Sequence, residues 1–167
     1  MTILKILHYP DPMLKKTCRP VDRLTSELQL CIADMAATMV EANGVGLAAP
    51  QIGLPLRIFI VDIWWKEQQQ YDRTLTFVNP KITAFDGSQR GREGCLSFPG
   101  LSAHVTRAQK IRVAATDINN QPFEMDAEGF LAVAIQHEMD HLNGLLMLDR
   151  VSPLVKKMML KKLKKLS

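Results

Sequence analysis

The chain of 167 residues is long enough for one domain with its own hydrophobic core, and its 47% hydrophobic and 23% charged content is typical of a globular protein. No stretch approaches the ~20 apolar residues of a membrane-spanning helix, and the opening residues lack the features of a secretory signal. Three scattered cysteines exclude a disulfide framework. We therefore expect one domain over residues 1–167, with no membrane span, in a reducing cytoplasm.

The charge is unevenly distributed along the chain. The formal net charge is +4, and residues 151–167 hold six lysines and no acid, which leaves −2 for the first 150 residues. A nearly neutral body with few aromatic residues speaks against a nucleic-acid-binding module as the main function.

Helical periodicity predicts a first helix over residues 26–41. Thr25 is expected to cap its N-terminus, and Glu27 lies in the first turn, where an acid is favourable. The residues Asn43 and Gly44 end this helix. Its predicted apolar face consists of Leu28, Cys31, Ile32, Met35 and Met39.

Two strands and a hairpin are predicted after this helix. Residues 57–63 form a buried strand and residues 75–83 a second strand, in which Pro80 favours an edge or a bulge. A hairpin is expected because the sequence alternates on both sides of a turn, at residues 110–113 and 123–126. The connections are predicted to be a polar loop at residues 64–73 and a mobile segment at residues 86–92.

A last, basic helix is predicted over residues 151–167, with Ser152 as N-cap and Pro153 at the first helical position. The simplest interpretation of its lysines is that they form the solvent-exposed face of the helix. The alternatives are attachment to RNA phosphates and to an anionic membrane surface. The apolar residues expected near one face of this helix are Val155, Met159, Leu163 and Leu166.

Residues 44–53 form a small, apolar, glycine-rich segment with one amide side chain, Gln51. The segment lacks the Gly-Lys-Ser/Thr ending of a phosphate-binding loop, and no helix pattern follows as in a dinucleotide fingerprint. Small residues allow the backbone to approach a ligand closely, but a tight turn in the core would use the same residues. Both interpretations stay open at this point.

The strongest chemical signal lies in the sequence QHEMDH at residues 136–141. His137 and His141 are four residues apart, so that on a helix both imidazoles lie on one face and could bind one metal ion. Glu138 would lie beside that ion as a proton carrier. The preceding run, residues 130–135, is apolar on every side and predicts a buried helix, which ends near Gly144. The alternative is two histidines satisfied by ordinary hydrogen bonds.

A catalytic metal site of this type has three protein ligands and one open position. The candidates for the third ligand are a carboxylate, a third histidine (His8 or His104) and the cysteine Cys95. Cys95 is favoured because it lies between glycine-flanked turns that could present a thiolate, although a lone cysteine is usually a small buried thiol.

Three segments together resemble the signature motifs of bacterial peptide deformylases, in the order that this family has them. The resemblance extends from residues 7–11 to the helix that starts at Ser152. It implies an α+β fold with mixed, mainly antiparallel strands packed around the central motif helix, and a C-terminal helix. The motifs are GVGLAAPQ at residues 44–51, EGCLS at residues 93–97 and QHEMDH at residues 136–141.

The resemblance implies a metal-dependent hydrolase that removes the formyl group from the N-terminal formyl-methionine of nascent polypeptides and releases formate. Cys95, His137 and His141 would bind one divalent metal, and Glu138 would act as the general acid–base. Gln51 through its side chain and Leu96 through its backbone N–H would stabilise the developing oxyanion. Asp140 is expected to orient neighbouring groups, with Arg107 as its partner. The expected lining of the methionine pocket is Val45, Gly46, Phe130, Val133 and Ala134.

The family commonly uses ferrous iron (Fe²⁺), and Zn²⁺, Ni²⁺ or Co²⁺ can occupy the same ligands. The expected partners are N-formyl-methionyl peptides and, through the basic helix, ribosomal RNA near the exit tunnel. A monomer is expected. Two other classes of function stay open, namely a structural metal site closed by a fourth ligand and an RNA-binding module, and a metallopeptidase is the alternative enzyme.

Overall fold

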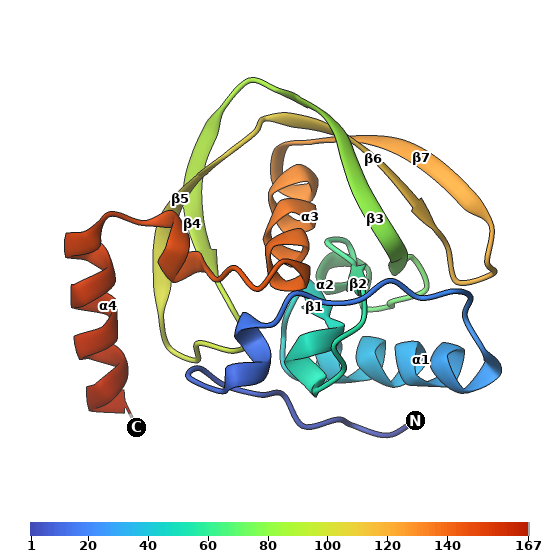
Figure 1. The fold of residues 1–167 in the computed structure, drawn as a ribbon, viewed down its shortest axis with the longest axis horizontal. Coiled ribbons are helices and arrows are strands. Elements are labelled where there is room, and N and C mark those ends of the chain that lie inside the picture. The colour runs from blue at the N-terminus through green and yellow to red at the C-terminus, as the bar shows by residue number, and fades with distance from the viewer. Residues whose placement is uncertain (167) are drawn as a thin grey trace.

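The computed structural model describes residues 1–166 as a five-stranded antiparallel sheet, a two-stranded hairpin and helices around them (Figure 1). The sheet has the order β1-β2-β3-β6-β7, and β4 pairs with β5. The strands are β1 (Gly46–Ala48), β2 (Ile58–Val61), β3 (Leu75–Asp86), β4 (Gln89–Gly94), β5 (Ser102–Arg107), β6 (Lys110–Thr116) and β7 (Pro122–Glu128). The helices are α1 (Ser26–Glu41), α2 (Trp65–Gln68), α3 (Gly129–Leu142) and α4 (Pro153–Leu166), with short 3₁₀ turns η1 (Pro12–Lys15), η2 (Ala49–Ile52) and η3 (Met147–Arg150).

The prediction of α1 is confirmed at both ends. The Thr25 side chain accepts a hydrogen bond from the Leu28 backbone N–H at 3.2 Å, which satisfies one of the free donors of the first turn. The buried Ile32, Met35 and Met39 pack against β1 and β2. This contact holds the segment that follows α1, residues 43–46, beside the sheet.

The predicted strands β2 and β3 and the hairpin β6–β7 are also confirmed. Pro80 lies in a central strand, because β3 pairs with β2 on one side and β6 on the other. The register shifts between Val78 and Lys81, so of the two predicted alternatives the bulge is present. Asn79 has a φ of 51° there, and its side chain exchanges hydrogen bonds with the Val21 backbone at 2.7 and 2.8 Å.

Two predicted loops contain regular structure. The segment 64–73 includes the short helix α2, and the segment 86–92, predicted to be mobile, contains most of β4. Strand β4 pairs with β5 from Gln89 opposite Arg107 to Gly94 opposite Ser102. The prediction failed because β4 has the sequence QRGREG, with no apolar residue that could signal a period of two.

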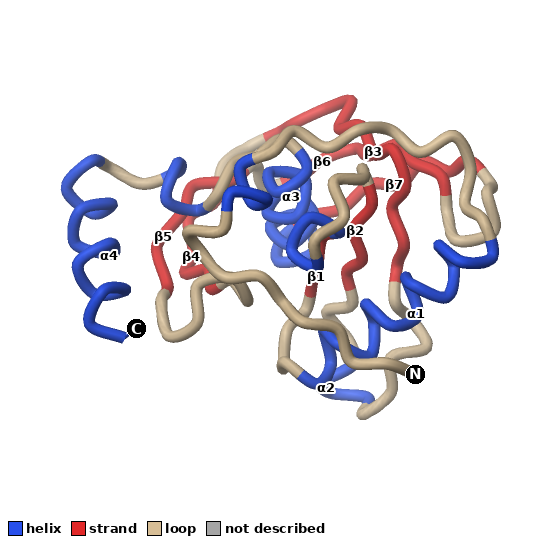
Figure 2. The backbone as a smooth tube through the Cα atoms, turned by 60° about the horizontal axis from the view of Figure 1, so that its bottom comes forward, coloured by secondary structure: helices blue, strands red, loops and turns tan. Residues whose placement is uncertain are grey.

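Helix α3 lies at the centre of the fold, between the large sheet and the β4–β5 hairpin (Figures 1 and 2). All residues from Ala134 to Leu142 are buried. The first turn differs from the prediction of burial on every side, because Phe130 is 55% exposed. Gly144, with a φ of 71°, follows the helix as predicted, and a Cβ there would collide with the Lys15 backbone.

Helix α4 packs on the edge of the molecule beside the β4–β5 hairpin (Figure 1). Met159 is buried and Leu163 is partly buried against this region. Val155 and Leu166 are 38% and 56% exposed, so the rest of the protein covers the predicted apolar face only in part. Within residues 1–166, none of the helices has the length and apolar content needed to cross a bilayer.

Candidate active site

Helix α3 and the end of β4 bring two imidazoles and a thiol together. Cys95 Sγ lies 3.4 Å from His141 Nε2, and the ligand atoms of Cys95, His137 and His141 all lie within 4.8 Å of one another. The bonds of a tetrahedral site with one sulfur and two nitrogen ligands place those atoms about 3.5 Å apart. The three residues therefore fit one divalent metal ion. The other histidines, His8 and His104, are exposed and belong to no such cluster among the described residues.

Two buried polar atoms have no hydrogen-bond partner among the described residues: Glu138 Oε2 beside the cluster, and His141 Nδ1 on the ring whose Nε2 faces Cys95. Leaving a buried polar atom unpaired is costly, so such atoms often mark the place of a ligand or a functional group. Burial lowers the pKa of His141 well below its usual value, which keeps the imidazole neutral and its lone pair available. This donor chemistry supports the fit of a metal ion.

Glu138 lies next to the cluster and faces β1. Burial raises the pKa of its carboxyl to about 7, which the nearby His137 opposes only in part. A carboxyl with this pKa can take up and release a proton near neutral pH. Its side chain needs Gly46 opposite, because a Cβ on Gly46 would lie 2.6 Å from Glu138 Oε1. Gly46, in the segment 44–53, thus lets the backbone approach the Glu138 side chain closely.

A buried chain of ionic contacts orients His137. Glu93 Oε1 lies 2.9 Å from His137 Nδ1, which leaves Nε2 free to face the cluster. Arg107 donates two hydrogen bonds of 2.9 Å to Glu93 and a third of 2.6 Å to Asp140. Burial alone would raise the pKa of Glu93, but the hydrogen bonds from Arg107 and His137 lower it to about 2. Arg150 completes the chain from the surface through two hydrogen bonds to Asp140.

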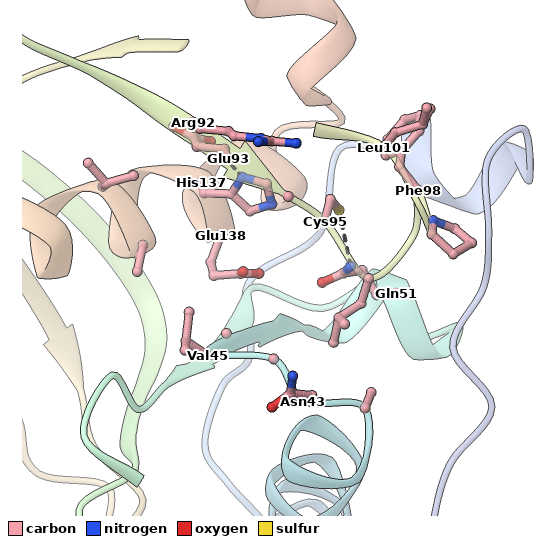
Figure 3. A pocket seen from close by; sticks show the side chains of 18 of the residues that line it. Asn43, Val45, Gln51, Arg92, Glu93, Cys95, Phe98, Leu101, His137 and Glu138 are labelled. Carbon is pink, nitrogen blue, oxygen red and sulfur yellow. Dashed lines mark hydrogen bonds and ion pairs between the residues drawn. The ribbon is translucent and has the colours of Figure 1, made fainter. Parts of the chain in front are cut away.

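Gln51 is fixed by both ends of its amide. Its Oε1 accepts a hydrogen bond of 2.9 Å from the Ala48 backbone N–H, and its Nε2 donates to Ser97 Oγ at 3.0 Å. The same Nε2 lies 3.7 Å from Cys95 Sγ. The acceptor end is thereby occupied by Ala48, the residue before the η2 turn, and the donor end faces the cluster, as Figure 3 shows. Leu96 follows Cys95 directly at the wall of the same pocket.

A pocket of about 540 Å³ opens beside the cluster (Figure 3). An apolar wall combined with a few polar groups is typical of a site for an amphipathic ligand. His137 and Glu138 line it from α3, and Gln51 and Cys95 line it from the opposite side. All five residues predicted for the methionine pocket belong to its lining, namely Val45, Gly46, Phe130, Val133 and Ala134.

Comparison with known proteins agrees with this geometry. The family model described as polypeptide deformylase matches residues 3–157. This chain belongs to the polypeptide deformylase family. It is 44% identical to the peptide deformylase of Chromobacterium violaceum over 99% of this chain and 96% of that protein. It is 45% identical to peptide deformylase 2 of Nitrosomonas europaea over 99% of this chain and 87% of that protein.

Solved structures of the deformylase family have the same fold. The peptide deformylase of Legionella pneumophila is 45% identical, with a TM-score of 0.92 over 99% of this chain and 95% of that one. The peptide deformylase of Synechococcus elongatus, solved in complex with actinonin, is 38% identical, with a TM-score of 0.89 over 95% of this chain and 86% of that one. The predictions of the family, of the α+β fold and of an enzyme of this class are therefore confirmed.

The deformylase motifs contain contacts that the sequence did not predict. Asp140 pairs with Arg107 as expected, but the second partner of Arg107 is Glu93, and Arg150 is a further partner of Asp140. Ser97, the buried acceptor for Gln51, was also missed. A signal was present for Glu93 and Ser97, since both lie in the EGCLS motif next to Cys95. No local signal pointed to Arg150.

Proposed function

We propose that residues 1–167 form one catalytic domain that removes the formyl group from the N-terminal formyl-methionine of nascent polypeptides and releases formate. The observation that carries this proposal is the cluster of Cys95, His137 and His141, with Glu138 beside it at the base of an apolar pocket. Membership of the polypeptide deformylase family supports it.

Cys95, His137 and His141 would hold one divalent metal ion. A thiolate with two imidazoles suits iron and zinc alike, and we propose Fe²⁺, with Zn²⁺, Ni²⁺ or Co²⁺ able to use the same donors. When bound, the ion lowers the pKa of water and polarises a carbonyl oxygen. Glu93, held by Arg107, keeps the His137 imidazole in the orientation and tautomer that such binding requires.

The remaining steps belong to the side chains of the pocket. Glu138 takes a proton from the attacking water and returns it to the amine that leaves. Negative charge develops on the formyl oxygen during the attack, and the Gln51 side chain and the Leu96 backbone N–H donate hydrogen bonds to it. The substrate methionine would lie against the apolar part of the pocket, which suits a flexible thioether side chain. We assign this part to Val45, Gly46, Phe130, Val133 and Ala134.

The first test is formate release from formyl-Met-Ala-Ser by protein purified without oxygen, with its metal content measured. We expect formate, about one metal ion per chain, and loss of turnover after treatment with a chelator that strips the ion. Acetyl-Met-Ala-Ser is the matched control, because it carries the same blocked amine without a formyl group. No formate from the metal-loaded protein would contradict the proposed reaction. Cleavage of a peptide bond in unformylated peptides would favour a metallopeptidase instead.

We also propose that α4 attaches the enzyme to ribosomal RNA, where its substrates emerge. Lys157, Lys161 and Lys162 are exposed on this helix, which also carries three further lysines. Phosphate contacts of this kind weaken steeply as the salt concentration rises. The protein is expected to act as a monomer there.

Replacing Lys157, Lys161 and Lys162 together by glutamine is expected to weaken cosedimentation with ribosomes and to make binding less dependent on salt. Turnover of a short formylated peptide should stay unchanged, because these side chains lie outside the pocket lining. The control removes the same charge elsewhere, at the exposed Lys5, Lys16 and Lys81. Equal ribosome binding by both variants would contradict the attachment.

A further inference from the structure

Two positively charged side chains lie at the open side of the pocket. Lys66 extends from α2 and Arg92 from β4, so that they reach the pocket from separate elements, and both are exposed. Arg92 Nε donates a hydrogen bond of 2.7 Å to Ser102 Oγ on β5. Figure 3 shows the Arg92 side chain running along the β4 side of the pocket toward Leu101. The guanidinium is thus held beside the pocket.

The open side of the pocket has no compensating negative charge among its described lining residues. Its two acidic lining residues, Glu93 and Glu138, are both buried. The Glu93 carboxylate is already paired with Arg107 and His137, and Glu138 lies beside the metal ligands. A substrate segment at the opening therefore meets the positive potential of two charged side chains, Lys66 and Arg92. The buried acids offset this potential only weakly.

The geometry of the proposed reaction brings substrate side chains to this opening. The inference rests on the proposed function, in which the substrate is a polypeptide whose formyl group reaches the metal ligands. A pocket of about 540 Å³ can hold only the first few residues of a polypeptide, so the chain that follows must leave through the open side. An extended chain advances about 3.3 Å per residue, so its second and third side chains pass within a Debye length of the rim.

We infer that Lys66 and Arg92 are specificity residues, which favour acidic side chains at the second and third positions of the formylated polypeptide and disfavour basic ones. Neither residue touches the reacting atoms. Their effect acts on the encounter and on binding, so it should appear in KM and leave kcat nearly unchanged. Because the charges are exposed, the effect should weaken as the salt concentration rises.

The test compares three amidated peptides, formyl-Met-Asp-Asp, formyl-Met-Ser-Ser and formyl-Met-Lys-Lys, on the metal-loaded enzyme at low and at high salt. Each peptide carries a C-terminal amide in place of the carboxylate, which would otherwise add a negative charge. We expect kcat/KM to be about three- to tenfold higher for the acidic than for the basic peptide at low salt, and the difference to shrink at high salt.

The double variant Lys66→Glu and Arg92→Glu should reverse this order of preference, while kcat for the neutral peptide stays nearly unchanged. Arg90→Glu is the matched control, because Arg90 is an exposed residue on the same strand but does not line the pocket. Equal kcat/KM for all three peptides, or an unaltered preference in the double variant, would overturn the inference and leave the proposed function standing. No formate from any peptide would overturn the proposed function itself.

Discussion

Replacing Glu138 by glutamine is expected to lower kcat for formate release by at least about 10²–10⁴-fold, the contribution of a positioned general acid–base. Glutamine has nearly the same shape, so the packing against Gly46 should remain. Glu138 does not belong to the cluster of Cys95, His137 and His141, and the metal content should stay near one ion per chain. Steady-state kinetics and metal analysis on the same preparation test both statements.

Two further variants separate the role of Glu138 from those of its neighbours. Cys95→Ala should lose the metal and the activity together, because it removes one of three ligands. Glu41→Gln, an exposed acid at the end of α1, should leave both unchanged. A Glu138→Gln enzyme with near-normal kcat would show that another group carries the proton. A Glu138→Gln enzyme that lost its metal would show instead that Glu138 helps to hold the ion.

Removing the Gln51 side chain is expected to lower kcat by about 10²–10³-fold, because one donor to the developing oxyanion is lost. Gln51→Ala also leaves the buried Ala48 N–H without its acceptor, so a loss of about 1–3 kcal/mol in unfolding free energy is expected. Gln51→Glu keeps that acceptor and removes the donor that faces Cys95. Both variants should therefore lose kcat.

The control for Gln51 is Ser97→Ala, which removes only the hydroxyl that accepts from the amide at 3.0 Å. Its kcat should fall much less than that of either Gln51 variant, because the amide donor is still present and the Ala48 contact still orients it. Thermal unfolding and kinetics at saturating peptide distinguish loss of catalysis from loss of structure. A Gln51→Ala enzyme with normal kcat would assign the oxyanion contact to other donors.

The sequence alone determined the elements whose signals are local. Helix α1 could be predicted to the residue because Thr25 caps it and its apolar residues recur with helical spacing. The hairpin β6–β7 followed from alternation on both sides of a turn. The spacing of His137 and His141 is enough to place two imidazoles on one helix face, because a helix fixes the geometry of residues four apart.

Only the tertiary structure decided which distant residues meet. Gln51 and Cys95 are 44 residues apart, as are Glu93 and His137. Gln51 of the η2 turn meets Cys95 just after β4, and Glu93 of β4 meets His137 of α3. Strand β4 itself escaped prediction, because a strand made of polar residues and glycine is held by backbone pairing and carries no hydrophobic period.

The packing of the whole chain also decides the other features that the sequence did not determine. Phe130 is half exposed because the first turn of α3 borders the pocket, although its apolar neighbours predicted burial. Lys66 and Arg92 belong to segments predicted to be loops, and only the placement of α2 and β4 at one pocket makes them neighbours of a substrate. Local periodicity encodes the face of an element, whereas the partners of that face depend on the packing of the whole chain.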